Sequence, residues 1–459
     1  MRSVESLSIN TVSTAIEPPL SEAAAEAWIP RTCFKNGPPS QIGVELEMLV
    51  ADARNPDGLA AHYPGDRYPA LVTELAAAGL DGRLTVEPGG QVELSSRPGS
   101  NLPHAIDTTR RDLTRLHRRA ARHGARLLGI GVDPLRPARR ITDEPRYVAM
   151  EKYLDSWGPA GRTMMCSTAS VQVNVEAGIH SDVGVNCIAG HSGPSPVLGF
   201  DDRWGLVHAV GPALVSAFAN SPCRAGRRSG WKSTRQAAWL DLDPARVGVP
   251  PRRANEDVPS AWTRWALDAP VMMIRRQHGP WTAPAGLTFR TWLQLGRGAV
   301  PDRAPATTDD LAYHLTTLFP QVRPKGYLEV RFIDAQPGQW WSVPPAVIGA
   351  LLDDSAAADE ARAACAPVEE RWRDAAKVGL ADAELQRAAS RTLRAAAASL
   401  RRDPSTAPLA EQVEAYLQRW TDRGRCPADD PTPSLSELTN TELTNTDLTN
   451  RTVQGDEAS

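Results

Sequence analysis

The chain has 459 residues, of which 41% are hydrophobic and 23% are charged, a composition typical of a soluble globular protein with a large core. A formal net charge of -3 argues against a polyanionic partner such as DNA or RNA. No stretch approaches the roughly 18 uninterrupted apolar residues of a membrane span, so no membrane segment is expected.

Three segments are expected along the chain. Residues 1–25 are small and polar, with two prolines near their end, and predict a flexible leader. Residues 26–429 predict one folded body. Residues 430–459 repeat the pattern Leu-Thr-Asn three times with few apolar side chains, which predicts a disordered tail.

The cysteines and the N-terminus favour a cytoplasmic protein. Six cysteines lie scattered without a CxxC pair, which predicts reduced thiols rather than a disulfide framework or a zinc site. The N-terminus lacks the basic-then-apolar pattern of a secretory signal.

Helices and long loops are expected to alternate in the folded body. Helical periodicity is clearest at 103–123, 206–219 and 307–318, and in an alanine- and arginine-rich stretch over 354–402 that breaks near Gly379. Pro344 and Pro345 fit the first turn of a helix running to about residue 353. Residues 222–260 and 276–305 are rich in Pro, Gly and Arg and predict long loops, which are often functional.

Five short segments alternate apolar and polar side chains with a period of two, namely 41–50, 83–87, 91–95, 170–175 and 327–333. This period places one apolar and one polar face on each strand. Pro88-Gly89-Gly90 predicts a tight hairpin between the second and third strands. The pattern therefore favours an antiparallel sheet whose apolar side is covered by helices.

The polar faces of these strands are unusually acidic. They carry two amides and five carboxylates, namely Gln172, Asn174, Glu45, Glu47, Glu87, Glu93 and Glu329. A solvent-facing sheet with ordinary polar decoration is one interpretation. If the strands share a sheet, however, the carboxylates crowd together, and divalent cations relieve such repulsion. An all-oxygen ligand set suits Mg²⁺, or alternatively Mn²⁺.

A nucleotide bound through metal ions would fit an acidic face of this kind, but the usual phosphate loop is missing. The sequence contains no G-x-x-x-x-G-K-[ST], and Gly129 and Gly131 form only a fragment of a dinucleotide fingerprint. If ATP binds, metal ions and arginines must hold its phosphates, which points away from P-loop and Rossmann folds.

Several blocks in order carry a resemblance to a known family. They are GVELE at 43–47, TVEPGGQVELSSRP at 85–98, MMCSTASVQVNV at 164–175, WKSTRQAAWLDLDPAR at 231–246, ALDAPVM at 266–272 and HLTTLFPQVRPKGYLEVRFIDAQ at 314–336. Over about residues 40–355 the sequence resembles the plant-type branch of the glutamate–cysteine ligases, which includes the actinobacterial enzymes of ergothioneine biosynthesis.

The resemblance implies a fold and a reaction. The implied fold is α+β and glutamine-synthetase-like, with a curved antiparallel β-sheet, helices on its outer face, and residues 26–429 as the catalytic domain. The implied enzyme takes the small molecules L-glutamate, L-cysteine and ATP, with Mg²⁺ as cofactor. It forms γ-glutamyl phosphate and then γ-glutamylcysteine, for ergothioneine or a related thiol.

The resemblance also assigns the acidic residues. It places Glu45, Glu47, Glu93 and Glu329 as metal ligands. Glu87 is a weaker candidate, because it could instead pair with an arginine near the hairpin.

Two arginines and a tryptophan are candidate substrate residues. Arg331 lies on the same strand face as Glu329, and we assign it to the phosphoryl group, with an ion pair to a neighbouring glutamate as the alternative role. Arg235 and Trp231 are expected in a loop that closes over a substrate. Arg235 could clamp an α-carboxylate with its two-pronged guanidinium, or be a surface loop residue. For Gln172 and Asn174, contacts to substrate or nucleotide compete with structural hydrogen bonds.

Two alternative functions are left open. A γ-glutamyl or carboxylate–amine ligase with a different amine acceptor would carry the same acids, so the segments 222–260 and 276–305 would set the acceptor. A non-catalytic binding protein with the same fold predicts gaps in the acidic set, and the sequence has none.

Overall fold

The computed structural model describes residues 18–35, 37, 41–54, 62–178, 198–300 and 304–430. Most of the expected leader and nearly all of the expected tail lie outside these residues. Helix α1 (Glu22–Cys33) begins before the boundary expected at residue 25, because the Ser21 side chain caps its first turn and Ala25 is buried. That boundary therefore falls inside a helix.

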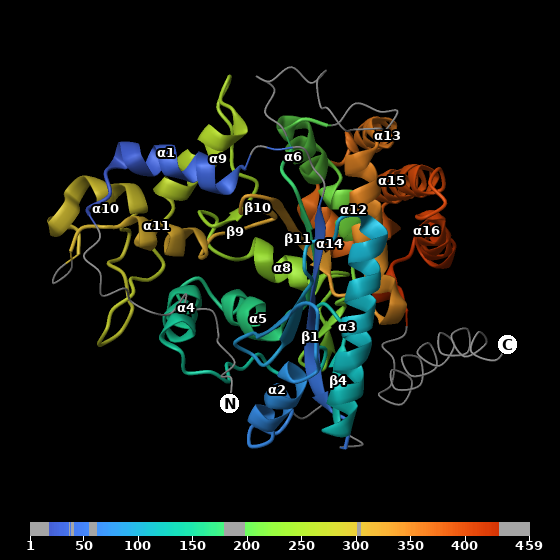
Figure 1. The fold of residues 1–459 in the computed structure, drawn as a ribbon, viewed down its shortest axis with the longest axis horizontal. Coiled ribbons are helices and arrows are strands. Elements are labelled where there is room, and N and C mark those ends of the chain that lie inside the picture. The colour runs from blue at the N-terminus through green and yellow to red at the C-terminus, as the bar shows by residue number, and fades with distance from the viewer. Residues whose placement is uncertain are drawn as a thin grey trace.

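A seven-stranded antiparallel sheet lies at the centre of the molecule (Figure 1). Its order is β10 (Val322–Pro324), β11 (Leu328–Asp334), β5 (Ser170–Val175), β1 (Ile42–Asp52), β3 (Val92–Ser95) and β2 (Arg83–Val86), with β4 (Ala125–Leu128) paired to the far end of β1. The five strands expected from the sequence are confirmed and share this sheet. The short strands β4 and β10 are additional.

The apolar face of the sheet is packed against helices. Val44, Val173 and Val330 are completely buried there, in a core shared with α7 (Gly211–Phe218), α12 (Val343–Asp353) and α15 (Ala383–Leu400). Further helices extend this layer, namely α6 (Phe200–Ala209), α13 (Ser355–Cys365), α14 (Trp372–Val378) and α16 (Ala407–Arg419). The α+β class, an antiparallel sheet with helices on its apolar side, is confirmed.

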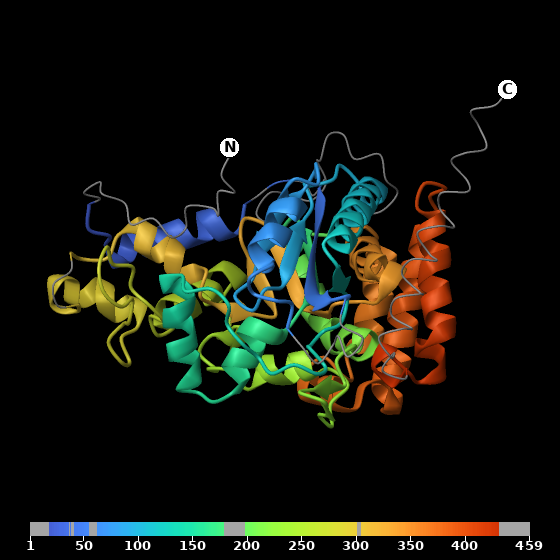
Figure 2. The same cartoon turned by 90° about the horizontal axis from the view of Figure 1, so that it is seen from below.

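A second group of elements lies on the other side of the sheet from α15 and α16 (Figures 1 and 2). It contains α4 (Pro145–Asp155), α5 (Ala160–Ser167), α8 (Thr234–Leu240), α9 (Val258–Asp268), α10 (Phe289–Leu295) and α11 (Thr308–Leu315). Helices α2 (Tyr68–Ala76) and α3 (Leu102–Arg122) pack beside the β2–β3 edge and β1, and two small ribbons pair β6 (Cys223–Arg224) with β7 (Arg227–Arg228) and β8 (Val247–Gly248) with β9 (Phe319–Pro320).

The helix expectations are confirmed where periodicity was strong. Helices α3, α11 and α12 match the expected ranges, and Gly379, with a φ of 58°, ends α14 at the expected break. The stretch 206–219 is two helices rather than one, because the chain restarts at Gly211-Pro212. The expectation of long loops over 222–260 and 276–305 is wrong in part, since these ranges contain α8, the start of α9, and α10.

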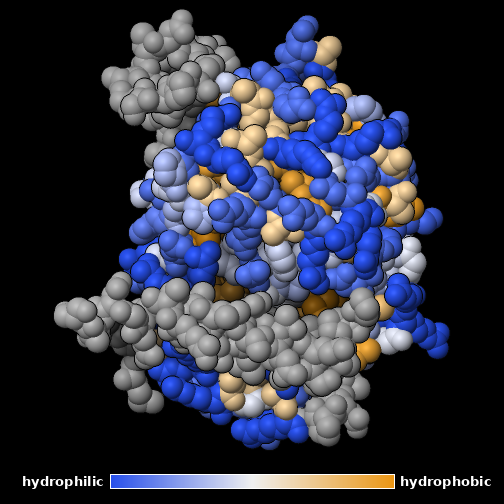
Figure 3. Space-filling model, turned by 90° about the vertical axis from the view of Figure 1, so that its right-hand side faces the viewer, coloured by the Kyte–Doolittle hydropathy of each residue, from blue (hydrophilic) through white to orange (hydrophobic). Residues whose placement is uncertain are grey.

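The surface on the side of α16 is predominantly hydrophilic, with isolated apolar side chains (Figure 3). Arg391, Arg394 and Arg401 of the helical layer are exposed. No described helix combines the length and the apolar character that crossing a membrane requires.

Candidate active site

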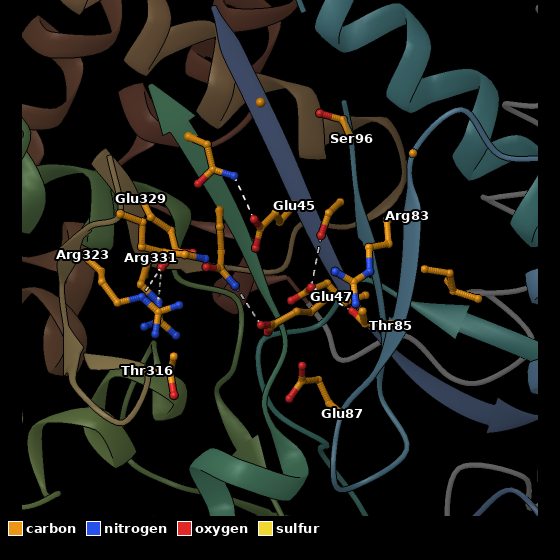
Figure 4. Close-up of a pocket in the computed structure, with 18 of the residues that line it drawn as sticks. Glu45, Glu47, Arg83, Thr85, Glu87, Ser96, Thr316, Arg323, Glu329 and Arg331 are labelled. Carbon is orange, nitrogen blue, oxygen red and sulfur yellow. Dashed lines mark hydrogen bonds and ion pairs between the residues drawn. The ribbon is translucent and has the colours of Figure 1, made fainter. Parts of the chain in front are cut away.

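Strand register brings the predicted acids onto one face of the sheet. Glu47 lies opposite Glu93 across β1 and β3, and Glu329 lies opposite Asn174 across β11 and β5. Glu45 pairs with a residue of β5, and Glu87 follows β2 in the hairpin. All five acids line one cavity of about 1040 Å³, and Figure 4 shows four of them facing it. The interpretation as a solvent-facing sheet with ordinary polar decoration is therefore wrong.

The hairpin that carries Glu87 is fixed by close packing. Its turn closes through the Gly90 amide, which donates to the Glu87 carbonyl oxygen over 2.9 Å. Gly90 has a φ of 85°, in the left-handed region that glycine favours. At Gly89 a Cβ atom would lie 2.0 Å from the carbonyl oxygen of Cys166, so only glycine fits. The Pro-Gly-Gly sequence thus places the hairpin against the end of α5.

Neutral side chains hold three of the acids. Asn174 Nδ2 donates to Glu45 Oε1 over 2.9 Å, and Gln172 Nε2 donates to Glu47 Oε1 over 2.9 Å. Glu93 Oε1 accepts from Thr85 Oγ1 over 2.9 Å. The structural hydrogen bonds considered for the two amides are therefore present. These bonds orient the carboxylates but bring no compensating charge.

The acids consequently resist ionisation. Burial, with repulsion from Glu93 and Glu329, raises the pKa of Glu45 to about 7. Burial, with repulsion from Glu93 and Glu47, raises the pKa of Glu87 to about 8. Burial likewise raises the pKa of Glu47 and of Glu93. Nearby cations, such as Lys325 for Glu45 and Arg146 for Glu87, lower these pKa values only in part.

Glu329 has the opposite environment. Arg323 Nε lies 2.6 Å from its Oε2, Lys325 Nζ lies 3.1 Å from its Oε1, and Arg331 Nε lies 3.5 Å from its Oε2. Burial alone would raise the pKa of Glu329, but these three cations outweigh it and hold the pKa well below its usual range. The ion pair considered for Arg331 is thus present, and both Arg331 and Glu329 line the cavity.

Several buried polar atoms beside the acids lack partners. Within the described residues, Arg331 Nη1, Gln172 Oε1 and Asn174 Oδ1 are buried and make no hydrogen bond. Native structures rarely leave such atoms unpaired. Their position around the cavity makes it the candidate binding place for a polar ligand.

Arg235 is buried behind the cavity. It lies in α8, not in a loop, and only 1% of the residue is exposed. Its Nη2 donates to the Arg331 carbonyl oxygen over 2.8 Å, and its guanidinium carbon lies 4.6 Å from the centre of the Trp239 ring. Nε and Nη1 of Arg235 have no partner within the described chain. The surface alternative for Arg235 is wrong, while its role toward a substrate stays a prediction.

Trp231 lies before α8 and away from the cavity. Its ring is partly buried and stands 5.6 Å from the guanidinium carbon of Arg373. Ser233 caps α8 through the Gln236 amide, over 3.0 Å, and donates to Asp334 over 2.8 Å. The expected loop position is therefore wrong for Arg235, which lies in this anchored helix, whereas Trp231 precedes the helix and is not among the residues that line the cavity.

Other residues at the cavity were not predicted. The cations Lys35, Arg83, Arg97, Arg146, Arg323 and Lys325 line it, and one wall is apolar, formed by Tyr147, Met150, Met164, Met165, Trp239 and Phe319. A signal for two of the cations is present in the sequence. Pro324-Lys325-Gly326 is a turn signal, and a turn there places Arg323 opposite Glu329, as the structure has it.

The donor set fits a divalent cation in chemistry. The available groups are clustered carboxylates, four of which have a raised pKa, and hard cations take oxygen ligands. No three acidic, His or Cys side chains converge on one point in the part of the chain that the structure describes. Mg²⁺ commonly uses only one or two protein carboxylates and completes its shell with water and phosphate. A facing pair such as Glu47 and Glu93 meets that requirement.

Comparisons with known proteins identify the family of this chain. The profile of glutamate–cysteine ligase family 2 matches residues 41–434. Glutamate–cysteine ligase EgtA of Mycolicibacterium smegmatis is 37% identical over 414 residues, covering 89% of this chain and 90% of that protein. The protein of the same name from Mycobacterium tuberculosis is 39% identical over 415 residues, covering 89% of each chain.

More distant relatives carry the same enzyme name. The chloroplastic glutamate–cysteine ligase of Medicago truncatula is 33% identical over 275 residues, which is 59% of this chain and 50% of that protein. Among solved structures, the Francisella tularensis glutamate–cysteine ligase in complex with AMP aligns with a TM-score of 0.47 at 12% identity, over 93% of this chain and 97% of that one. The family match and the two EgtA relatives, each aligned over most of both chains, establish that this chain belongs to glutamate–cysteine ligase family 2.

Proposed function

We propose that this protein uses ATP to join L-cysteine to the γ-carboxylate of L-glutamate, forming γ-glutamylcysteine, ADP and phosphate. The observation that carries the proposal is a cavity lined by five clustered carboxylates and several arginines and lysines, in a chain of this family. The EgtA relatives support a role in ergothioneine supply.

The chemistry requires charge neutralisation more than covalent help from the protein. A carboxylate is a poor acyl donor, and phosphorylation of the glutamate γ-carboxylate supplies a leaving group. The cysteine amine then displaces phosphate. Phosphoryl transfer depends mainly on positioning and on stabilising charge, so a cavity that combines carboxylates with arginines and lysines suits it.

The acidic side is the proposed binding place for Mg²⁺. Glu45, Glu47 and Glu93 would hold the ion, with Glu87 and Glu329 as additional ligands. When bound, Mg²⁺ neutralises phosphate charge between nucleotide and protein. The raised pKa of Glu45 supports this assignment, because burial and repulsion from Glu93 and Glu329 outweigh the attraction of Lys325.

Polar atoms without partners suit the organic substrates. Arg331 Nη1 is a donor available to the transferred phosphoryl group. The carbonyl oxygens Gln172 Oε1 and Asn174 Oδ1 are acceptors suited to a substrate N–H or O–H group. Nε and Nη1 of Arg235 are donors available to an α-carboxylate. To reach them, the substrate must extend behind the sheet face on which Arg331 lies, because Arg235 donates to the Arg331 carbonyl oxygen.

We place the reaction in the cytoplasm, where ATP and reduced cysteine are both available. The described cysteines, namely Cys33, Cys166, Cys223, Cys365 and Cys426, are free thiols, which supports a reducing compartment.

The test is a substrate survey on the full chain. Purified protein is incubated with Mg²⁺, ATP and glutamate, amino acids are added one at a time, and ADP release and product mass are measured. We expect cysteine-dependent ADP release and a product with the mass of γ-glutamylcysteine. Turnover with another amine and none with cysteine would establish the alternative ligase. Nucleotide binding without turnover on any amine would support the non-catalytic alternative.

A further inference from the structure

The Gln91 side chain lies on the acidic face of the sheet, in the hairpin that joins β2 and β3. It precedes Val92, which is buried in the core, so by alternation it points to the same side as Glu93. Across the hairpin the Glu87 amide donates to the Gln91 carbonyl oxygen over 2.8 Å, which pairs these two residues. Gln91 therefore has one acid opposite it and another two positions along its own strand.

A third acid, Glu47, completes this group. It lies opposite Glu93 across β1 and β3. Figure 4 shows Glu87 beside Glu47, and repulsion from Glu93 and from Glu47 adds to the effect of burial in raising the pKa of Glu87. The three acids and Gln91 all line the same cavity. One neutral amide thus lies among three carboxylates.

One end of the Gln91 amide is fixed by a buried hydrogen bond. Nε2 donates to the Thr168 carbonyl oxygen over 2.9 Å, and only 3% of Gln91 is exposed. Turning the amide over would place its oxygen against that carbonyl oxygen, and two acceptors cannot share a hydrogen bond without a donor. The Thr168 contact therefore determines that Oε1 is the end left for another partner.

Oε1 of Gln91 has no such partner in the part of the chain that the structure describes. It is buried and accepts no hydrogen bond. Native structures rarely leave a buried polar atom in this state, because its lost hydration is then not replaced. Ionised carboxylates are acceptors only, so the neighbouring acids in that form cannot supply a proton to it. A cation among these oxygens would satisfy the amide and the acids together.

We propose that Gln91 Oε1 is a further oxygen ligand of the divalent-cation site, beside the facing pair Glu47 and Glu93. The inference rests on the proposed function, since it adds a residue to the metal site proposed there. Carbonyl oxygens suit the same hard cations as carboxylates do. A neutral oxygen also extends the set of ligands without adding to the repulsion between the acids.

A purely structural role for Gln91 explains these contacts less well. Such a role uses Nε2 alone and leaves Oε1 buried at a cost in free energy. The hairpin turn also has another tie of the same kind, because the Tyr68 hydroxyl donates to the Gly90 carbonyl oxygen over 2.8 Å. That second bond provides a comparison in which the hairpin is loosened and no oxygen is lost from the cavity.

The test measures binding of Mn²⁺ alone to the full chain at pH 8, without nucleotide. The electron paramagnetic resonance signal of free Mn²⁺ gives the fraction bound, and displacement by Mg²⁺ gives the affinity for that ion. In Gln91→Met the side chain fills a similar volume but lacks the amide oxygen. We expect Gln91→Met to bind Mn²⁺ about tenfold or more weakly, as for loss of one polar contact to a charged group.

Tyr68→Phe is the matched control. It removes one hydrogen bond from the same turn, and Tyr68 is not among the residues that line the cavity. Its affinity for Mn²⁺ should match that of the parent protein. Melting temperatures in EDTA show what each lost hydrogen bond contributes to folding. A purely structural Gln91 predicts that both variants melt lower and that both keep the parent's affinity for Mn²⁺.

Gln91→Glu restores an oxygen at the same place. A carboxylate oxygen also suits the cation, so this variant should bind Mn²⁺ at least as tightly as the parent protein and more tightly than Gln91→Met. Weaker binding than the parent would overturn the proposal, even where Gln91→Met failed to fold.

The remaining outcomes are also decisive. Parent-like affinity in Gln91→Met would overturn the assignment of Gln91, and equal losses in Gln91→Met and Tyr68→Phe would overturn it in favour of the hairpin's position. A parent protein that does not bind Mn²⁺ saturably would overturn the proposed metal site as well. Cysteine-dependent turnover of the parent is measured separately, so an active enzyme with unchanged Mn²⁺ binding in Gln91→Met would contradict this inference alone.

Discussion

Glu47 and Glu93 lie directly opposite each other on the neighbouring antiparallel strands β1 and β3. Like charges in this position destabilise a sheet. Burial and the charge of Glu47 together raise the pKa of Glu93, and neutral hydroxyl groups are the donors it receives. The strand pair therefore carries a repulsion that a bound cation would relieve.

Replacement of Glu93 by Gln should raise stability and remove activity. Without Mg²⁺ the variant should melt at a higher temperature than the parent, because the repulsion with Glu47 is gone. Turnover should fall by about 100-fold or more, as for loss of one electrostatic contact to the reacting groups. Thermal melts in EDTA and ADP release measure the two effects. Glu370→Gln, at an exposed position, is the control, and a lower melting temperature for Glu93→Gln would contradict the repulsion argument.

Stability should depend on pH and on Mg²⁺ together. The pKa of Glu45 is raised from 4.5 to about 7, and that of Glu87 from 4.5 to about 8. Between pH 4.5 and these raised values, the folded protein therefore holds more protons than the unfolded chain. Stability of the metal-free protein should therefore fall as pH rises through this window. Mg²⁺ should raise the melting temperature more at pH 8 than at pH 6.

The control for this pH effect removes one titrating group. Glu87→Gln should flatten the fall in stability with pH, because its side chain no longer releases a proton. Melting temperatures in EDTA and in Mg²⁺ at both pH values provide the measurement. An equal Mg²⁺ effect at the two pH values would show that these carboxylates do not govern binding of the ion.

Period-two alternation was enough to predict the acidic face, because the apolar side chains of each of these strands all face the same way. Glu45 and Glu47 alternate with Val44 and Leu46, and the burial of the two apolar residues fixes where the glutamates point. Register follows from the same constraint, since a shift of one residue would expose the core. The shared face of the acids was therefore predictable from local pattern.

The cation cluster and helix α8 carried no comparable signal. Arg323 is one of 46 arginines, and its pairing with Glu329 becomes visible only when the turn between them is recognised. In α8 six successive residues, Thr234 to Trp239, are all buried, so no apolar stripe marks the helix. Its start depends on the Ser233 cap, and Arg235 was consequently predicted to lie in a loop.

Replacement of Arg235 by Lys tests its proposed contact with the glutamate α-carboxylate. Lysine keeps a positive charge beside Glu47. It lacks the guanidinium fork of arginine, in which Nη2 donates to the Arg331 carbonyl oxygen while Nε and Nη1 are available to a substrate. We expect KM for glutamate to rise about tenfold or more while KM for ATP changes little, as for loss of a bidentate pair. Steady-state kinetics with each substrate varied in turn provide the measurement.

A structural role for Arg235 predicts a different pattern. If the residue only supports the sheet, both KM values and the melting temperature should change together in Arg235→Lys. Buried Asp334 offers a comparison, because it anchors the chain around Arg235 by accepting from Ser221 and Ser233. Asp334→Asn should lower the melting temperature and affect both substrates, which is the signature that Arg235→Lys should lack.

Gly89→Ala tests whether the hairpin holds the acids in register with α5. The added methyl group would lie 2.0 Å from the Cys166 carbonyl oxygen, and backbone atoms cannot yield as a flexible side chain can. We expect the hairpin to move, Glu87 and Glu93 to shift, and turnover to fall more than about tenfold, since misplacement of about 1 Å can cost two orders of magnitude. Gly205→Ala in α6, where a Cβ would meet open space, is the matched control and should leave turnover unchanged. Because alanine favours a helix, that control should keep or slightly raise the melting temperature. If Gly89→Ala retained full turnover at a lowered melting temperature, the hairpin would contribute to stability without setting the positions of its two acids.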